Sequence, residues 1–185
     1  MRAFEREIVR HCSPTLAGIK TGNLFSYPFS DYRHIINLIA DWNNSLNIRG
    51  VYFKILKTTP HRILIYVYRK NRLLQDLFCP KVISFLAEIG YQIRDIDSCL
   101  DFLSLRVQNS MDFPHEIGLF LSYPFEDVEG FINHQGKDCI HCGYWKVYYN
   151  ENEKVKLFTQ YKKCTQKYFQ RLISGSSILT LTVAA

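Results

Sequence analysis

Hydrophobic and polar positions recur along the chain with two periods, one of about 3.6 residues and one of two, and these periods predict its helices and strands. In residues 31–47 apolar side chains recur every three or four positions, which predicts an amphipathic helix. Residues 50–59 and 62–69 are rich in β-branched and aromatic side chains and are separated by a break at Pro60, which predicts a β-hairpin. Residues 23–27 have the same character and predict another strand.

The middle of the chain has the periodicity and the end signals of helices. Pro80 occupies a suitable first helical position, and Gly90 follows the apolar pattern as a stop signal. Ser98 and Asp101 have the spacing of a capping box, in which side chains satisfy the free N–H groups at a helix start. The predicted helices cover residues 72–78, 80–90, 98–109 and a short segment at 128–132.

The last third of the chain predicts further strands and one long helix. Residues 117–123, 143–149 and the apolar tail at 177–185 each have the composition of a strand. A long helix is expected before the tail from the spacing of its apolar residues. This segment is basic, because seven Lys or Arg residues occur from Lys146 to Arg171. Its apolar stripe has helical spacing and consists of Val155, Phe158, Tyr161, Tyr168, Phe169 and Leu172. We interpret the basic residues as a solvent-exposed face, with an anionic partner as the alternative.

Two pairs of similar stretches suggest an internal duplication. "LFSYPFSDY" resembles "LFLSYPFEDV", and "GVYFKIL" resembles "CGYWKVY". If this likeness exceeds the chance similarity of aromatic strands, residues 12–75 and 113–172 are repeated β-α-β halves. The chain of 185 residues is expected to form a single domain, 1–185, of the α/β or α+β class, with a mixed β-sheet flanked by helices.

Composition and cysteine content indicate a compartment. The first residues mix both charge signs without an apolar stretch, and no apolar run reaches the roughly 20 residues that span a bilayer. We therefore expect a cytoplasmic protein that has no membrane partner. In a reducing compartment its six cysteines are expected to be thiols. Cys79 and Cys99 lie in apolar patterns and are expected to be packing residues.

Cys12 is the first candidate for a reactive group. It precedes Ser13 and Pro14, a pair typical of a helix start, and it follows Arg10 and His11. A helix N-terminus and neighbouring cations both favour the thiolate, which is the nucleophilic form of cysteine. The sequence therefore predicts a catalytic thiol here, with an inert thiol in a polar loop as the alternative.

A base for this thiol is predicted at His115, with Glu116 beside it as the third candidate catalytic residue. Neighbouring residues on an extended segment point to opposite faces, so Glu116 has the alternative roles of contacting Lys20 or capping a helix. Lys20 lies in a loop between two glycines and is a candidate for holding an anionic group of a substrate.

The stretch "CIHCG" suggests a metal site as an alternative to thiol chemistry. Cys139 and Cys142 have the C-x-x-C spacing with which two thiolates bind one metal ion. A structural zinc site needs two further ligands, and the sequence has no second such pair. Under this alternative the protein binds a metal ion, an iron–sulfur cluster or haem, with Cys142 and Cys164 as ligands and Cys12 and His115 as further candidates. Ordinary unligated thiols are the simpler interpretation.

Four stretches of the chain resemble one known protein family. Residues 12–25, 113–132, 142–149 and 161–165, in this order, resemble the bacterial family called domain of unknown function 3793, common in anaerobic low-GC Gram-positive bacteria. The likeness covers nearly the whole chain but implies no activity. It implies that several candidate substrate-binding residues occupy motif positions, namely Lys20, Tyr123, Tyr144, Trp145 and Lys146. The family pattern usually has glycine where Ser122 stands in this chain.

These observations support three functions. The first is a cytosolic thiol-dependent enzyme that acts on a small molecule, anionic if Lys20 contributes, through Cys12 and His115. The second is the metal-, iron–sulfur- or haem-binding protein. The third is a nucleic-acid-binding module that uses the basic helix and exposed aromatic residues. It ranks last, because the sequence contains no recognisable nucleic-acid-binding motif.

Overall fold

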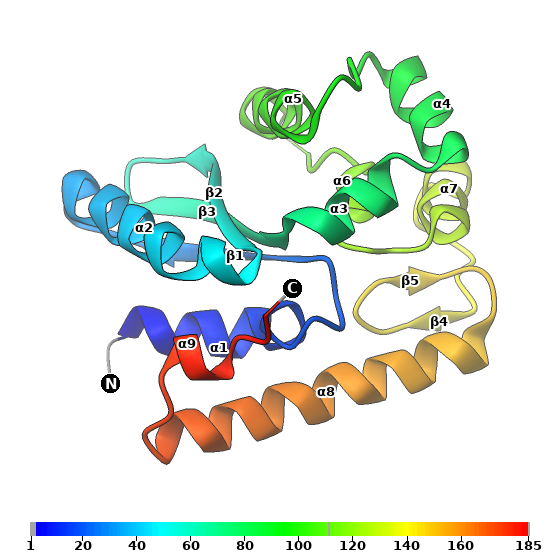
Figure 1. Cartoon of the computed structure of the whole chain (residues 1–185). Coiled ribbons are helices and arrows are strands. Elements are labelled where there is room, and N and C mark those ends of the chain that lie inside the picture. The colour runs from blue at the N-terminus through cyan, green and yellow to red at the C-terminus, as the bar shows by residue number, and fades with distance from the viewer. Residues whose placement is uncertain (1–2, 111, 185) are drawn as a thin grey trace.

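A three-stranded antiparallel β-sheet packs against helices (Figure 1). A separate two-stranded hairpin lies beside the N-terminal end of the longest helix. This computed structural model describes residues 3–110 and 112–184. The architecture is a single α+β domain, as the sequence predicts. In Figure 1 the long helix α8 (Glu151–Ile173) runs below α1 (Ala3–Leu16) and reaches the hairpin at its N-terminal end.

The sheet confirms the predicted hairpin and the predicted first strand. It consists of β1 (Gly22–Pro28), β2 (Val51–Thr58) and β3 (Arg62–Arg69), in the order β1-β3-β2. The expectation of a mixed sheet is wrong, because both pairings are antiparallel. The strands β1 and β2 run in the same direction, but β3 inserts between them and pairs antiparallel with each.

The first helix corrects the prediction that a helix starts at Ser13. Helix α1 begins at Ala3, and both Ser13 and Pro14 lie in its last turn. Apolar side chains at helical spacing pack one face of this helix into the core. The buried residues of that face include Phe4, Ile8, Val9, Cys12 and Leu16. Cys12 therefore lies near the C-terminal end of a helix, where the partial charge of the backbone does not favour a thiolate.

The next helices largely match the sequence patterns. They are α2 (Tyr32–Leu46), the short 3₁₀ helix η1 (Asn47–Arg49), α3 (Lys70–Leu77), α4 (Pro80–Ile89) and α5 (Ile96–Asn109). Pro80 begins α4, and Gly90 ends it with a left-handed φ of 104°. The capping box of α5 is formed by Asp95 and Ser98, where the Ser98 N–H donates to the Asp95 carboxylate over 2.7 Å. The predicted box of Ser98 and Asp101 is therefore displaced by one turn.

The segment at 117–123 is not the predicted strand. Helix α6 (Ile117–Phe120) occupies its first residues, and α7 (Phe125–Asn133) follows and confirms the short helix predicted at 128–132. The turn is closely packed at Gly118, where only a glycine fits. A Cβ atom added there would lie 2.8 Å from Val128 and 2.9 Å from Tyr123. Tertiary packing has here overridden the local strand propensity.

The C-terminal third contains β4 (His141–Cys142), β5 (Lys146–Val147), α8 and α9 (Ile178–Leu181). The strand predicted at 143–149 is reduced to the two residues of β5, and α9 replaces the strand predicted in the tail, whose last residue, 185, lies outside the described residues. Neither segment joins the main sheet. The two halves of the chain therefore do not form equivalent β-α-β units.

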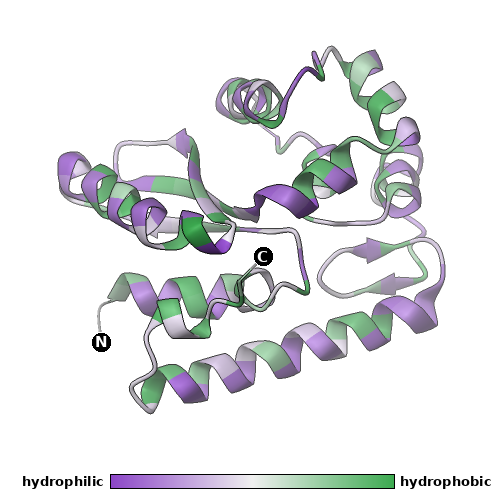
Figure 2. Ribbon diagram, in the orientation of Figure 1, coloured by the Kyte–Doolittle hydropathy of each residue, from purple (hydrophilic) through white to green (hydrophobic). Residues whose placement is uncertain are grey.

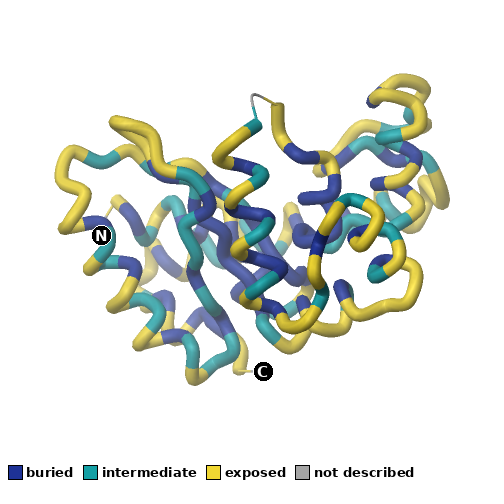
Figure 3. The backbone as a smooth tube through the Cα atoms, turned by 90° about the horizontal axis from the view of Figure 1, so that it is seen from above, coloured by how far each residue is buried: buried dark blue, intermediate teal, exposed yellow. Residues whose placement is uncertain are grey.

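Strand β3 contributes side chains to two hydrophobic clusters. Seen from above, the buried parts of the backbone gather in the interior of the molecule and the exposed parts surround them (Figure 3). Ile63, Ile65 and Val67 belong to the cluster that α1 and α2 complete. Tyr66 and Tyr68 alternate with them and belong to the other cluster, which includes residues of α3 to α7. A third, smaller cluster joins the hairpin to α8 and contains Trp145, Val147, Phe158 and Tyr161.

Helix α8 is amphipathic, as predicted, and its polar and apolar positions alternate along the ribbon in Figure 2. It buries Phe158, Tyr161 and Leu172. Its exposed residues include Lys156, Lys162, Lys163, Lys167 and Arg171. Among the helices of the described residues, none is both long enough and apolar enough to cross a membrane.

Candidate functional site

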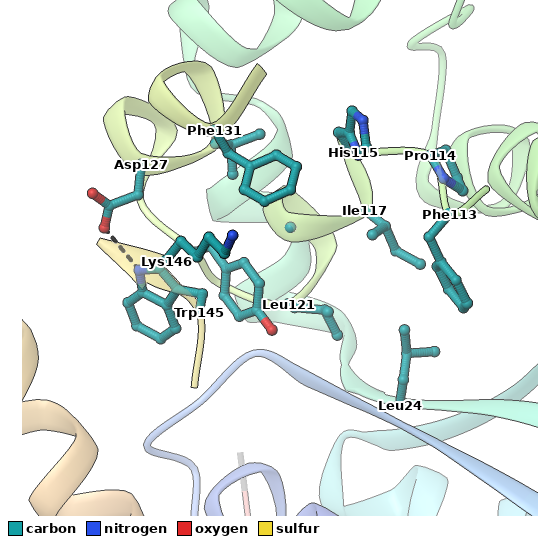
Figure 4. Close-up of a pocket in the computed structure, with 13 residues that line it drawn as sticks. Leu24, Phe113, Pro114, His115, Ile117, Leu121, Asp127, Phe131, Trp145 and Lys146 are labelled. Atoms are coloured by element: carbon teal, nitrogen blue, oxygen red, sulfur yellow. Dashed lines mark hydrogen bonds between the residues drawn. The ribbon is translucent and has the colours of Figure 1, made fainter. Parts of the chain in front are cut away.

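A pocket of about 340 Å³ lies where the loop before α6 meets α7 and the β-hairpin (Figure 4). Leu24 of β1 and Phe113 border it on one side, and Phe131 and Trp145 border it on the other. Most of its lining is apolar, which is typical of a site for a small organic molecule. Of the residues predicted to bind substrate, it contains Tyr123, Trp145 and Lys146, together with His115.

Asp127 holds the hairpin against α7 and so fixes one wall of the pocket. Its carboxylate accepts hydrogen bonds from Trp145 Nε1 over 2.8 Å and from the backbone N–H groups of Tyr148 and Tyr149 over 2.8 and 3.1 Å. Asp127 is 1% exposed. A buried carboxylate that accepts three hydrogen bonds fixes the positions of the groups that donate to it. We therefore assign Asp127 a structural role.

An aromatic wall follows from this arrangement. The rings of Trp145 and Tyr123 stack with their centroids 4.6 Å apart, and Phe158 of α8 meets the indole edge-on at 4.5 Å. Burial raises the pKa of Tyr123 to about 12, so its hydroxyl is protonated at neutral pH. Trp145 is 7% exposed and lines the pocket, so its fluorescence is suited to report on pocket occupancy.

Two nitrogen-bearing side chains stand at this pocket, on either side of the Phe131 ring (Figure 4). The exposed His115 imidazole meets Phe131 edge-on at 5.0 Å. Lys146 Nζ lies 5.9 Å from the centre of the same ring and donates to the Gly136 carbonyl over 2.5 Å. The pocket thus combines an apolar interior with two groups that can donate hydrogen bonds to an acceptor.

The Glu116 carboxylate is held by Arg106 and Tyr91, so it does not take the role of orienting the His115 imidazole, in line with the expected divergence of neighbouring side chains. Its buried carboxylate accepts hydrogen bonds from Arg106 Nε of α5 and from the Tyr91 hydroxyl over 3.1 Å. Hydrogen bonding to the carboxylate raises the pKa of Arg106, and burial raises that of Tyr91. Glu116 therefore ties the loop before α6 to α5 and supports the mouth of the pocket indirectly.

The prediction that Cys12 is a reactive thiolate is contradicted by its surroundings. Cys12 has no exposed surface and lies in the cluster between α1 and the sheet. Burial raises the pKa of its thiol far above the usual range, and the nearby Lys20 offsets this only in part. Cys12 does not line the pocket that contains His115. The structure therefore does not bring the proposed nucleophile and base together.

Lys20 is also buried rather than exposed in a loop. It is 3% exposed, and its ammonium lies 5.4 Å from the centre of the Tyr123 ring and 5.9 Å from that of Tyr161. Burial lowers the pKa of Lys20 to about 8, and the proximity of Cys12 opposes this shift. The aromatic rings stabilise the cation. Lys20 does not line the pocket, so the predicted role in holding a substrate is not supported by its position.

Replacing Lys20 by Met is expected to raise the free energy of unfolding at pH 7 by about 1–3 kcal/mol, because a buried charge costs more to desolvate than its neighbours return. The pKa is about 8 in the folded chain against an ordinary 10.5. Between these values the unfolded chain retains a proton that the folded chain has lost, so wild-type stability rises with pH relative to the variant. The advantage of Lys20→Met should be full below pH 8 and shrink as pH rises towards 10.5.

Urea unfolding of the wild type and of Lys20→Met, at pH 7 and at about pH 10, measures the difference in stability at each pH. The free energy of unfolding is extrapolated linearly to zero urea. Lys137→Met is the control, because Lys137 is exposed and should show no such dependence. A Lys20→Met variant less stable than wild type at pH 7 would contradict the conclusion that the buried ammonium is a net cost.

The remaining cysteines do not assemble a metal site. Cys99 is buried, as predicted, whereas Cys79 is exposed and so is not the packing residue that was expected. Cys142 is exposed at β4, and burial raises the pKa of Cys164 to about 11. Within residues 3–110 and 112–184, no three His, Cys, Asp or Glu side chains are grouped as they would be to hold a metal ion.

Two residues that shape this pocket were not among the candidates from the sequence. Phe131 separates His115 from Lys146, and Asp127 organises the hairpin, yet neither was a candidate. Asp127 lies in the first turn of α7 and resembles an ordinary helix-start acid in sequence. Tyr144 was a candidate, but it is 42% exposed on the other side of the hairpin and does not line the pocket.

Ser122 shows why a glycine suits its position. Its φ of 56° is left-handed, a conformation that glycine adopts most readily. The serine hydroxyl accepts a hydrogen bond from the Thr21 N–H over 2.8 Å, which joins the loop after α1 to the turn after α6. The side chain thus provides a contact that a glycine would lack.

Comparison with known proteins gives a family but no activity. The family described as "Protein of unknown function (DUF3793)" matches residues 8–182. No curated protein and no solved structure matches the chain. Because the match covers nearly the whole length, it agrees with the resemblance seen in the four sequence stretches. The chain therefore belongs to the DUF3793 family of proteins of unknown function.

Proposed function

We propose that this protein binds a small, largely apolar molecule that carries an anionic group, in the pocket between the loop before α6, helix α7 and the β-hairpin. The observation that carries the proposal is the pairing of His115 and Lys146 around Phe131 in an otherwise mostly apolar pocket. Pockets of about 300–1,000 Å³ with few polar groups are typical of small-molecule sites, and the volume of about 340 Å³ suits a compact ligand.

The aromatic lining favours a ligand with a flat or ring-shaped apolar part. Tyr123 and Trp145 form one stacked wall, and the exposed side chain of Phe113 stands near Leu24 (Figure 4). Aromatic side chains contribute a large apolar area at little conformational cost and prefer offset or edge-on contact with other rings. An aryl group is therefore the expected partner of this wall.

The charge of the ligand follows from the two nitrogen groups. An ammonium has three N–H donors, and Lys146 uses one of them on the Gly136 carbonyl. In the described part of the chain, Lys146 forms no ion pair, and His115 forms neither an ion pair nor a side-chain hydrogen bond. A carboxylate or similar anion would receive charge-assisted hydrogen bonds from these groups, which are stronger than those between neutral groups.

This proposal replaces the thiol-dependent reaction with binding. The Cys12 thiol is buried and protonated, so it does not support nucleophilic attack on a ligand in the pocket. His115 remains in the proposal as a lining residue of the pocket whose side chain is exposed.

Fluorescence of Trp145 tests occupancy of the pocket. The chain has two tryptophans, so the Trp42→Phe variant leaves Trp145 as the only reporter. Phenylbutyrate, an aryl carboxylate, is expected to change its emission saturably. Leu24→Phe, which adds bulk at the pocket, should weaken binding at least about tenfold, equivalent to ~1.4 kcal/mol. Leu38→Phe is the control, because Leu38 is half-buried on α2 and lies outside this pocket.

Two results would reject the pocket as the binding site. One is an emission that does not saturate with phenylbutyrate. The other is an equal loss of affinity in Leu24→Phe and Leu38→Phe, which would indicate a general effect of added bulk on the fold.

A further inference from the structure

A second surface, on the side of the hairpin away from the pocket, carries features of a polymer-binding groove. Two hollows of about 480 and 770 Å³ lie along α8, and both are bordered by Tyr144 and Lys162. Because they share these two residues, they adjoin one another. The first extends toward His141 of the hairpin, and the second extends toward Arg10 of α1. We call the two hollows together the α8 groove.

The α8 groove is positively charged. Its lining includes Arg10 and Lys162, and among the described residues that border it there is no Asp or Glu. Beyond Glu153 the sequence of α8 contains no acidic residue. The same segment contains six basic residues, namely Lys154, Lys156, Lys162, Lys163, Lys167 and Arg171. Within the described residues, the carboxylates that pair with the groove lining lie at its two ends, where Glu7 meets Arg10 and Glu151 meets His141.

An aromatic ring stands in the middle of this charged surface. Tyr144 is 42% exposed, and it rests against Tyr161 edge-on at 5.4 Å and against Phe158 at 5.5 Å. Its position is therefore fixed from behind while part of the ring remains accessible. Phe169 provides a second aromatic contact further along the groove, beneath the Arg6 guanidinium at 5.9 Å.

The length of the groove suits an extended chain rather than a single small anion. Its helical border runs from Val155 to Gln170, which is about 22 Å at a rise of ~1.5 Å per residue. Uncharged polar side chains occur along it, including Thr159, Thr165 and Gln166. These can donate and accept hydrogen bonds between the charged positions.

We propose that the α8 groove binds single-stranded nucleic acid, with Lys162 and Arg10 contacting phosphates and Tyr144 stacking on a base. Proteins that bind single strands combine a basic groove with aromatic side chains on which bases stack. A duplex would not offer an unpaired base to Tyr144, and an acidic polypeptide would use the charges without requiring the ring. This function is separate from ligand binding in the pocket, because Tyr144, Lys162 and Arg10 do not line that pocket.

Fluorescence anisotropy of a fluorescein-labelled oligothymidine of about twelve nucleotides tests the proposal, since single-strand sites cover roughly 4–16 nucleotides. The wild type is expected to bind it more tightly than a duplex of equal length. The Arg10→Gln/Lys162→Gln variant should reduce the slope of log K against log salt by about 1.4, or ~0.7 for each phosphate contact. The control is Lys81→Gln/Lys137→Gln, in which both residues are exposed and neither lines the groove, and it should keep the slope.

The stacking contact is tested separately. Tyr144→Leu keeps apolar bulk against Phe158 and should weaken oligothymidine binding by about 5- to 150-fold. The salt slope should remain unchanged in this variant, because no charge is lost.

Three results would overturn the proposal. The first is no binding of the oligonucleotide at low salt. The second is equal or tighter binding of the duplex together with unchanged affinity in Tyr144→Leu, which would indicate non-specific attraction of polyanions. The third is displacement of the oligonucleotide by polyglutamate at equal charge concentration together with unchanged affinity in Tyr144→Leu, which would favour an acidic protein partner.

Discussion

Replacing Arg69 by Met is expected to lower the free energy of unfolding by about 3–5 kcal/mol, because it removes several hydrogen bonds from a buried charged donor, each worth about 1.5–3 kcal/mol. Arg69, at the end of β3, is 4% exposed. Its guanidinium donates to the carbonyl groups of Thr15 and Leu16 over 2.6 Å each and to that of Val183 over 2.7 Å. Without it, the end of α1 and the C-terminal segment lose their shared charged donor, and the carbonyls of Thr15 and Leu16 keep only the backbone donors Gly18 N–H and Val183 N–H.

Urea denaturation of Arg69→Met measures this loss, with Arg62→Met as the matched control. Arg62 lies at the other end of β3 and donates to the hydroxyl and the carbonyl of Ser26 over 2.8 and 3.0 Å. These hydrogen bonds are exposed, so their removal is expected to cost less than about 1 kcal/mol. Similar losses in the two variants would contradict the central role of Arg69.

Replacing Asp127 by Ala is expected to lower the free energy of unfolding by about 3–4 kcal/mol, because two backbone N–H groups and the Trp145 indole lose a charged acceptor. The hairpin should also detach from α7 and expose Trp145. Denaturation followed by Trp145 emission in the Trp42→Phe background measures both effects, since exposure of an indole to water shifts its emission to longer wavelength.

Glu129→Ala is the control for this prediction, because Glu129 is an exposed carboxylate on the same helix. It should leave both the stability and the emission close to those of the parent, within about 0.5 kcal/mol. An Asp127→Ala variant with unchanged emission would show that the hairpin is held mainly by the packing of Trp145 against Tyr123 and Phe158.

The parts of the fold that the sequence predicted correctly have strong local signals. The hairpin of β2 and β3 follows from β-branched and aromatic strands around a turn, and α4 is bounded by Pro80 and Gly90. The segment at 117–123 lacked such signals, because an apolar run of seven residues fits a strand and a buried helical turn equally well. In the fold, Gly118 packs closely against Val128 and Tyr123, and such contacts depend on tertiary structure.

The candidate site was predicted only in part, because burial in the fold decides which of the candidate side chains can react or bind. His115, Tyr123, Trp145 and Lys146 do meet at one pocket. Cys12 was selected from its charged neighbours and from the Ser-Pro pair, but its position on the buried stripe of α1 decides its chemistry. That stripe was visible in the sequence as apolar residues at helical spacing from Phe4 onward, and Cys12 falls on it.

The separation of Glu116 from His115 was foreseen from geometry alone, because neighbouring side chains on an extended segment diverge. The partner of Glu116 was not predicted. Arg106 is ten residues away in α5, and no spacing rule links the two residues. Long-range ion pairs of this kind depend on how helices pack against one another, which a single sequence does not specify.

Calorimetric titration with phenylbutyrate and with the neutral analogue phenylbutanol tests the proposed anion-binding pocket most directly. Phenylbutyrate should bind the wild type about 10- to 150-fold more tightly, the range expected for a hydrogen bond to a charged group. Lys146→Met should lose most of this preference while still binding phenylbutanol, and Lys137→Met should keep it, because Lys137 lies outside the pocket. Equal binding of the two compounds by the wild type, or a preference that survives in the Lys146→Met/His115→Gln variant, would contradict the account.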